Sequence, residues 1–185
     1  SRNTANFNIT PYLQKGKNTV AAEVYRSSDG SFLEAQDMFR LPGIFRTVAL
    51  YSVPKVHFRD LVATPDLDAT YTDGSLTVNA EIRNLDKKAI KDYKVYYSLY
   101  ANKLYSDENT LVDGFLSPVI DKIAPNETGS VQTVLKVKAP NKWSAEFPYR
   151  YTLVAELKDK KNRTVEMVST IVGFRKVEIK DTPAS

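Results

Sequence analysis

The sequence contains no cysteine, so disulfides and thiolate metal sites are excluded for these 185 residues. A single histidine, His57, makes a histidine-rich metal centre or a Ser-His-Asp triad hard to build. No apolar run approaches the ~20 residues that a membrane-spanning helix requires. The lack of cysteine does not indicate a compartment, so the location of the protein stays open.

The sequence also lacks clusters of like charge, because no run of five like charges occurs. Lysine and arginine number 26 against 22 aspartates and glutamates, which leaves a net charge of +4. The two signs are interleaved, as on a solvated strand face, so we expect neither a nucleic-acid partner nor a membrane surface. With 42% apolar residues the chain has enough material for a packed core.

No segment keeps a helical period, whereas short alternating apolar runs with turn signals between them predict an all-β chain. Residues 1–53 form a first unit, in which Val20, Ala22 and Val24 alternate as in a half-buried strand and Arg46–Ser52 forms another. So few strands do not make an independent sandwich. We interpret this unit as part of a larger β domain and expect it to expose apolar side chains.

Residues 54–174 form a second, complete unit with about seven strands, typical of an immunoglobulin-like β-sandwich. Its clearest strand alternates Leu76, Val78, Ala80 and Ile82 toward one face. The same pattern is found in two further sets, which are Tyr93, Val95, Tyr97, Leu99 and Tyr151, Leu153, Ala155, Leu157. The candidate strands are Lys55–Thr64, Ser75–Asn84, Asp92–Ala101, a short one near Phe115–Ile123, Gly129–Ala139, Tyr149–Lys158 and Val165–Gly173.

The stretch Ser28–Val48 has neither the helical period nor the alternation of a strand. It mixes acids, amides, arginines and phenylalanines with glycine and proline. Irregular loops of this composition usually carry sites, because their polar groups are presented rather than paired in a ladder. Asp37 is the candidate binding residue. On the residues alone, a turn cap or an ion pair with Arg40 is the commoner role for a loop aspartate.

Three motifs in order resemble family-two glycoside hydrolases of the β-galactosidase type. They are the Ser28–Val48 loop, the Trp-Ser-Ala-Glu-Phe-Pro run that starts at Trp143, and Gly173–Ile179. The resemblance implies the end of a jelly-roll sugar-binding domain in residues 1–53 and an immunoglobulin-like domain in 54–174. Residues 175–185 would then start the link into a TIM-barrel catalytic domain.

The resemblance also implies roles for single residues. Asp37 would contact a sugar hydroxyl and help to hold a sodium ion, a chemistry that suits an ionised carboxylate. Gln36, Arg40 and Arg46 would support the loop. For the second motif we expect structural roles: Trp143 plugs the base of the sandwich, and Glu146 satisfies buried backbone donors or a nearby arginine.

Retaining glycosidases of this kind use two carboxylates about 5 Å apart. By resemblance these belong to the barrel, so we expect no catalytic residue and no hydrolase activity in this chain, and a structural turn for Asn126-Glu127. We expect no cofactor here, and sodium and magnesium in the intact enzyme. Its partners would be a β-galactoside, its own barrel and further copies of itself in an oligomer.

Two alternatives remain open. The chain can be a free-standing carbohydrate- or protein-binding module with an immunoglobulin-like core. It can also belong to a β-glucuronidase or β-mannosidase relative. On any of these interpretations the sequence does not decide between bacterial cytoplasm and periplasm. The reading frame that surrounds these residues discriminates the first alternative, and activity on matched aryl glycosides discriminates the second.

Overall fold

The computed structural model describes residues 5–27, 29–33, 43–44 and 46–179. The chain divides into two compact units, Ser1–Tyr51 and Ser52–Ser185. Each unit is described by itself below.

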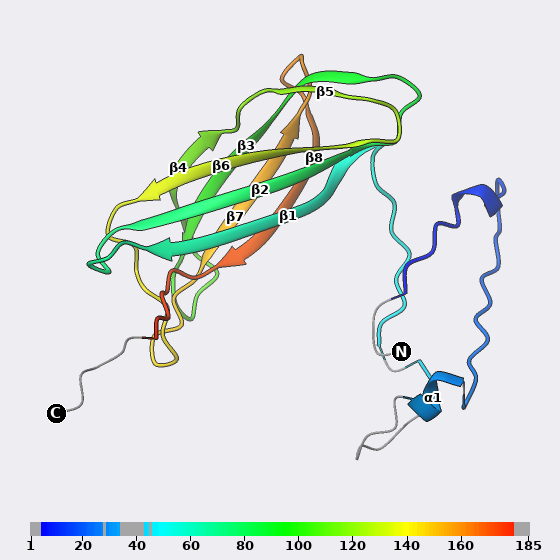
Figure 1. Ribbon diagram of the computed structural model, residues 1–185, viewed down its shortest axis with the longest axis horizontal. Helices are drawn as coiled ribbons and strands as arrows, with labels where there is room; N and C mark the ends of the chain where they lie inside the picture. The colour runs from blue at the N-terminus through cyan, green and yellow to red at the C-terminus, as the bar shows by residue number, and fades with distance from the viewer. Residues whose placement is uncertain (1–4, 28, 34–42, 45, 180–185) are drawn as a thin grey trace. The chain divides into compact units, whose positions relative to one another are not determined.

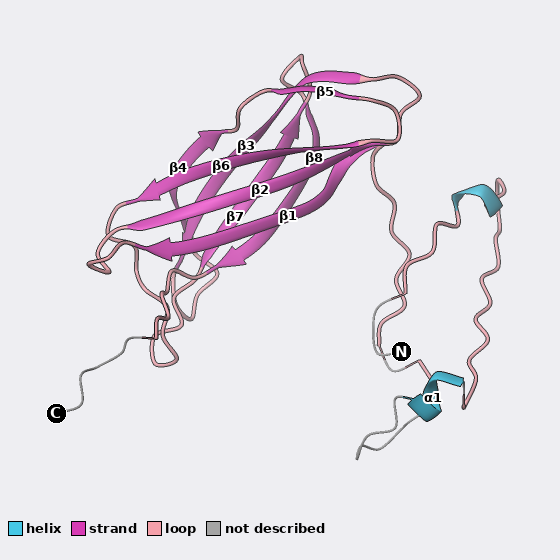
Figure 2. Cartoon of the chain, viewed as in Figure 1, coloured by secondary structure: helices cyan, strands magenta, loops and turns pink. Residues whose placement is uncertain are grey.

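The second unit is an antiparallel β-sandwich (Figures 1 and 2). One sheet has the order β1-β2-β6, and the other has the order β4-β3-β7-β8 with β5 also paired to β3. The strands are β1 (Val56–Leu67), β2 (Gly74–Asn84), β3 (Ile90–Asn102), β4 (Asn109–Leu116), β5 (Ile120–Ile123), β6 (Thr128–Val137), β7 (Tyr151–Lys158) and β8 (Thr164–Val172). The predicted all-β sandwich of immunoglobulin type is confirmed.

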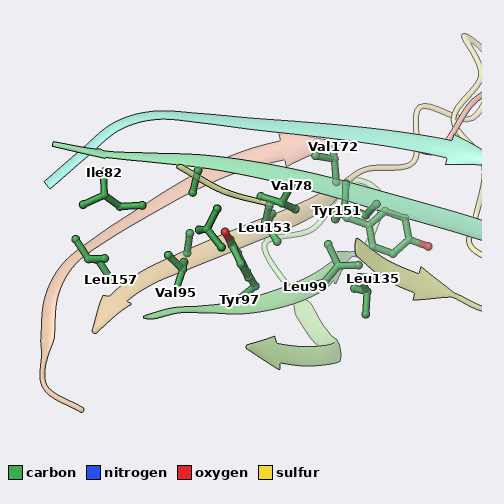
Figure 3. Close-up of a cluster of buried hydrophobic side chains, with 14 of the residues drawn as sticks. Val78, Ile82, Val95, Tyr97, Leu99, Leu135, Tyr151, Leu153, Leu157 and Val172 are labelled. Carbon is green, nitrogen blue, oxygen red and sulfur yellow. The ribbon is translucent and has the colours of Figure 1, made fainter. Parts of the chain in front are cut away.

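The core lies between the two sheets and follows from the alternation in the sequence. Leu76, Val78, Ala80 and Ile82 of β2 are fully buried, with half-buried residues between them. The opposing sheet contributes two further buried sets (Figure 3), which are Val95, Tyr97, Leu99 from β3 and Leu153, Ala155, Leu157 from β7. Each fully buried large apolar side chain contributes roughly 1.5–3 kcal/mol to folding, so these strands fix the register of both sheets.

The short strand predicted near Phe115–Ile123 is in fact two strands, β4 and β5, which pair with successive parts of β3. Ser117 joins them. The Ser117 hydroxyl accepts a hydrogen bond from the Val95 amide at 2.8 Å. The Ser117 backbone amide donates to the Val95 carbonyl at 2.8 Å. β4 was hard to recognise because it lies at a sheet edge with mostly exposed residues, so its sequence lacks a strict alternation.

Asn84 is a fully buried polar residue at the end of β2. Its side-chain amide donates to the carbonyls of Lys88, Ile123 and Ala124 at 2.9–3.2 Å, and its carbonyl oxygen accepts from the Asp86 amide at 2.9 Å. The backbone amide and carbonyl of Asn84 also bond to the turn between β5 and β6. One side chain therefore ties β2 to two turns.

The first unit differs from the expectation. Its described residues hold a 3-10 turn at Thr10–Tyr12 and α1 at Asp29–Leu33, and the strands predicted around Val20–Val24 and at Arg46–Ser52 do not form. A strand needs a neighbouring edge for its backbone groups, and these segments pair with none in the described residues. Apolar side chains are exposed as expected, among them Val20 at 75% and Leu50 at 79%.

The network of Asn84 predicts a large loss of stability when its side chain is removed. Asn84→Ala leaves the buried Ile123 carbonyl without its donor and removes two part-buried bonds, to the carbonyls of Lys88 and Ala124. Because one buried group left without a partner costs ~1–3 kcal/mol, we expect the free energy of unfolding to fall by at least that amount. Urea unfolding followed by the fluorescence of Trp143 measures it. The control is Asn79→Ala on the same strand, which loses one exposed bond to Gln132. Equal losses for both variants would contradict the assigned role.

The buried hydroxyl of Tyr97 predicts that the protein loses stability at alkaline pH. Its hydroxyl and that of Thr133 are both buried without a well-formed hydrogen bond, and burial raises the pKa of Tyr97 to about 12, with Thr133 close enough to lower it in part. Since the unfolded tyrosine ionises near pH 10, stability should fall as pH rises from 10 to 12, by up to about 3 kcal/mol.

Tyr97→Phe should remove that part of the pH dependence. At pH 7 it should unfold no more easily than wild type, because an unsatisfied buried hydroxyl is lost. Denaturant titrations of both proteins between pH 7 and 12 measure the difference. The interpretation would be refuted if the free energies of unfolding of the two proteins fell in parallel above pH 10, or if the variant were less stable than wild type at pH 7.

Candidate functional site

The loop that the sequence singles out is described only in part. Gln36, Asp37 and Arg40 lie outside the described residues, so their roles stay predictions. Gly43 has a φ of 115°, a left-handed conformation that favours glycine, although no atom lies within 4 Å of a Cβ placed there. Arg46 is exposed, and its part in supporting the loop is likewise a prediction.

The structure brings the second and third motifs together at one end of the sandwich. The Trp143 amide, between β6 and β7, donates to the Phe174 carbonyl at 2.9 Å. The Arg175 guanidinium lies 5.0 Å from the centroid of the Trp143 ring, a cation–π contact. A Cβ on Gly173 would come within 3.1 Å of the Trp143 side chain, so glycine permits this approach.

Phe174, rather than Trp143, fills the interior at this end. Phe174 is fully buried and meets the Tyr151 ring edge-on at 5.2 Å, whereas Trp143 is half-buried beside it. Sequence reasoning missed Phe174, although it continues the alternation of Thr170 and Val172.

Glu146 is exposed and has local partners. Its own backbone N–H, followed by the Ser144 hydroxyl, lowers the pKa of the carboxyl group. The loop is closed by further local bonds, since the Ser144 amide donates to the Phe147 carbonyl at 2.9 Å. The carboxylate therefore helps to shape a surface turn. The expected bond to buried backbone donors or to an arginine is not found among the described residues.

Beside Trp143 lies an open hollow of about 830 Å³. Its wall includes an indole, a guanidinium, amides and hydroxyls, contributed by Asn102, Tyr105, Trp143, Pro148, Arg150 and Thr152. The Thr152 hydroxyl donates to the Asn102 side-chain oxygen at 3.1 Å. The wall also includes the Lys103 ammonium and the Asp107 carboxylate. These groups can hydrogen-bond a polar ligand, but the wall holds one carboxylate and not the pair that a retaining glycosidase uses.

Other candidate features have structural roles. Asn126-Glu127 lies in the turn between β5 and β6, as predicted, where the Asn126 amide donates to the Asn84 carbonyl at 2.7 Å. Among the described residues no group of three histidine, aspartate or glutamate side chains is placed to hold a metal. Nor do the described ranges contain a helix long and apolar enough to cross a membrane.

Comparison with protein families matches both units. Residues 56–175 match the model described as glycosyl hydrolases family 2, and residues 1–54 match the sugar binding domain of glycosyl hydrolases family 2.

Among curated proteins, a beta-galactosidase of Priestia megaterium is 42% identical over 177 residues, which is 96% of this chain and 16% of that protein. A beta-galactosidase of Photobacterium profundum is 40% identical over 185 residues, 98% of this chain and 17% of that protein. The chain therefore spans about one sixth of the length of these relatives.

Solved structures show the same fold at lower identity. Beta-glucuronidase 2 of Bacteroides uniformis matches with a TM-score of 0.73 and 20% identity, over 91% of this chain and 20% of that chain. A beta-glucuronidase of Parabacteroides merdae matches with a TM-score of 0.53 and 23% identity, over 69% of this chain and 15% of that chain.

Proposed function

The chain belongs to glycosyl hydrolase family 2, and we propose that it is a non-catalytic part of a β-galactosidase, an enzyme that hydrolyses terminal β-D-galactose from β-galactosides. The observation that carries this proposal is the 42% and 40% identity to proteins named beta-galactosidase along nearly the whole chain. Similarity to beta-glucuronidases stays at or below 23% for the structures compared above and supports the fold alone.

In this proposal the chemistry lies elsewhere in the intact enzyme. A retaining glycosidase needs an acid/base and a nucleophilic carboxylate about 5 Å apart. We assign both to a barrel domain that follows residue 179, and no catalytic residue to this chain. The only Asn-Glu pair of the sequence is engaged in the turn between β5 and β6, which supports that assignment.

The sandwich would act as a brace. Its two sheets share one core, and its end is closed by Phe174 and the Trp143 loop, so it holds a fixed shape. A rigid module of this kind can position neighbouring parts of an enzyme and carry contacts between subunits of an oligomer.

The Ser28–Val48 loop would complete the galactose subsite. We propose that Asp37 accepts a hydrogen bond from a sugar hydroxyl and serves as one oxygen ligand of a sodium ion, with Gln36, Arg40 and Arg46 supporting the loop. Bound sodium would supply a fixed positive charge close to the sugar hydroxyls. Magnesium remains a proposal for the intact enzyme, without assigned ligands here.

The alternative is a free-standing carbohydrate-binding module. The hollow beside Trp143 favours it, because an indole with amide and hydroxyl neighbours suits a sugar. The brace is preferred because the matches to the relatives cover 96% and 98% of the chain and therefore include both units.

Activity assays test the proposal. The protein expressed from the full reading frame around these residues should hydrolyse an aryl β-galactoside faster than the matching β-glucuronide or β-mannoside. The 185-residue chain alone should give no turnover above a mock preparation. Turnover by the chain alone would refute the inactive brace, and a preference for another glycoside would refute the substrate.

Asp37 should matter for the substrate in that full-length protein. Because hydrogen bonds to charged groups are worth ~1.5–3 kcal/mol, Asp37→Ala should lower kcat/KM by about 10- to 150-fold. It should also abolish any difference between sodium and potassium buffers. Asp29→Ala, an exposed aspartate of α1, is the matched control. If the two variants had the same kinetics, Asp37 would not be a subsite residue.

A further inference from the structure

The strand β4 lies at an edge of its sheet, where it pairs with β3 (Figure 1). The ladder between the two strands skips Val112, which is an extra residue in a β-bulge just before Asp113. Asp113 and Gly114 follow the bulge, and both are exposed. An exposed edge strand with an interrupted ladder opens locally more readily than the strands that form the core. The backbone at Asp113 is therefore freer to change conformation than that of β2 or β7.

The carboxylate of Asp113 lies against the backbone nitrogen of the next residue. The Gly114 amide donates to Asp113 Oδ1 at 2.7 Å. Because Oδ1 is bonded to Cγ, the nitrogen and the carboxyl carbon are held close together, as ring closure between them requires. Glycine also leaves the nitrogen unhindered, since it has no Cβ and adopts backbone conformations that other residues avoid. Asp113-Gly114 thus combines proximity, exposure and a small neighbour, the conditions for closing a five-membered succinimide ring.

Among the described residues of the sandwich, three other aspartates make the same contact but lack the glycine. The carboxylates of Asp60, Asp66 and Asp86 accept from the next backbone amide at 2.9, 2.8 and 2.7 Å. Leucine or lysine follows each of them, and a side chain at that position crowds the nitrogen. The contact alone therefore does not make these three positions reactive.

The second Asp-Gly pair of the sandwich, Asp73-Gly74, has the glycine but is held in place. The Asp73 carboxylate accepts from the Ala139 amide at 2.9 Å, so it is engaged by a distant part of the chain. Gly74 is buried at the start of β2 and pairs with Leu67 on one side and Val137 on the other. Its backbone is released only when the sheet opens.

We propose that Asp113 is a site of spontaneous isoaspartate formation. The Gly114 nitrogen bonds to Asp113 Cγ, while the proton of the nitrogen and the hydroxyl of the protonated carboxyl group leave as water. Water then adds to one of the two ring carbonyls and breaks its bond to the nitrogen. Opening at Cγ restores aspartate, whereas opening at the backbone carbonyl leaves a main chain that runs through Cγ. The net change is an isomerisation, and it does not depend on the proposed function.

Isoaspartate at position 113 disturbs the packing of β4. The main chain gains one carbon atom before Gly114, so Gly114 and Phe115 no longer lie opposite Ser98 and Tyr97. The Phe115 ring stacks on the Tyr97 ring at 4.9 Å, a contact that depends on this register. Protein isomerised at Asp113 should therefore unfold at a lower urea concentration than fresh protein.

Water labelled with heavy oxygen detects each passage through the ring, because opening of the succinimide adds one labelled oxygen to the residue. The 185-residue protein is incubated in it at neutral pH, both folded and unfolded in urea, and fragmentation mass spectrometry locates the label. In the folded protein the label at Asp113 should exceed that at Asp73 by at least ~10-fold, because Gly74 is released only by a larger opening. In urea the two residues should be labelled at similar rates.

Gly114→Ala tests the part played by glycine. The Tyr96 hydroxyl lies over Gly114, so the substitution is made in a Tyr96→Phe protein, which serves as the matched parent. The parent should keep its label at Asp113, and the double variant should lose most of it while still unfolding cooperatively in urea. Equal labelling of Asp113 and Asp73 in the folded protein, or an undiminished label in the double variant, would overturn the proposal.

Discussion

The burial of Phe174 is the interaction on which the functional end of the sandwich depends. The ring lies against Gly74, where an added Cβ would come within 2.9 Å of it, and meets the Tyr151 ring edge-on, so it joins β2 and β7. Its carbonyl holds the Trp143 amide, and Arg175 next to it covers the Trp143 ring. Because neighbouring residues alternate sides, seating Phe174 also determines that Lys176 and Glu178 face the sandwich. Phe174 therefore fixes both the loop at Trp143 and the residues that follow it, 175–179.

The opposite end of the sandwich is organised by hydrogen bonds rather than by a ring. Asn84 is buried with donors and acceptor all used, which is the condition under which a buried polar group adds order instead of a penalty. Tyr97 and Thr133 show the contrasting case inside the core, where two hydroxyls are buried without well-formed bonds. The apolar packing of Tyr97, including its stacking on Phe115 at 4.9 Å, outweighs that defect.

Most of the sandwich was predictable from the sequence, because its central strands bury one face completely. β2 and β7 keep a strict alternation, and the structure confirms their register. Three features were not predictable for physical reasons. β4 lies at an edge and needs no apolar face. Trp143 was expected to plug the base of the sandwich, whereas Phe174, which continues the alternation of β8, fills the interior there. The alternation around Val20 is a local property, and no sequence pattern supplies the neighbouring strand that would turn it into a ladder.

The candidate site was accessible to sequence only through resemblance, and the two units explain why. Asp37 belongs to a unit whose described apolar side chains, such as Val20 and Leu50, are exposed, so the described residues of that unit form no core that would hold a loop in a fixed geometry. A single carboxylate specifies no ligand without the surrounding walls of a pocket. In the proposed enzyme those walls and the cover for the apolar side chains come from the same neighbouring parts. Formation of the subsite and stability of the first unit would then be coupled, because both depend on the same neighbouring parts, whereas the sandwich has a buried core of its own.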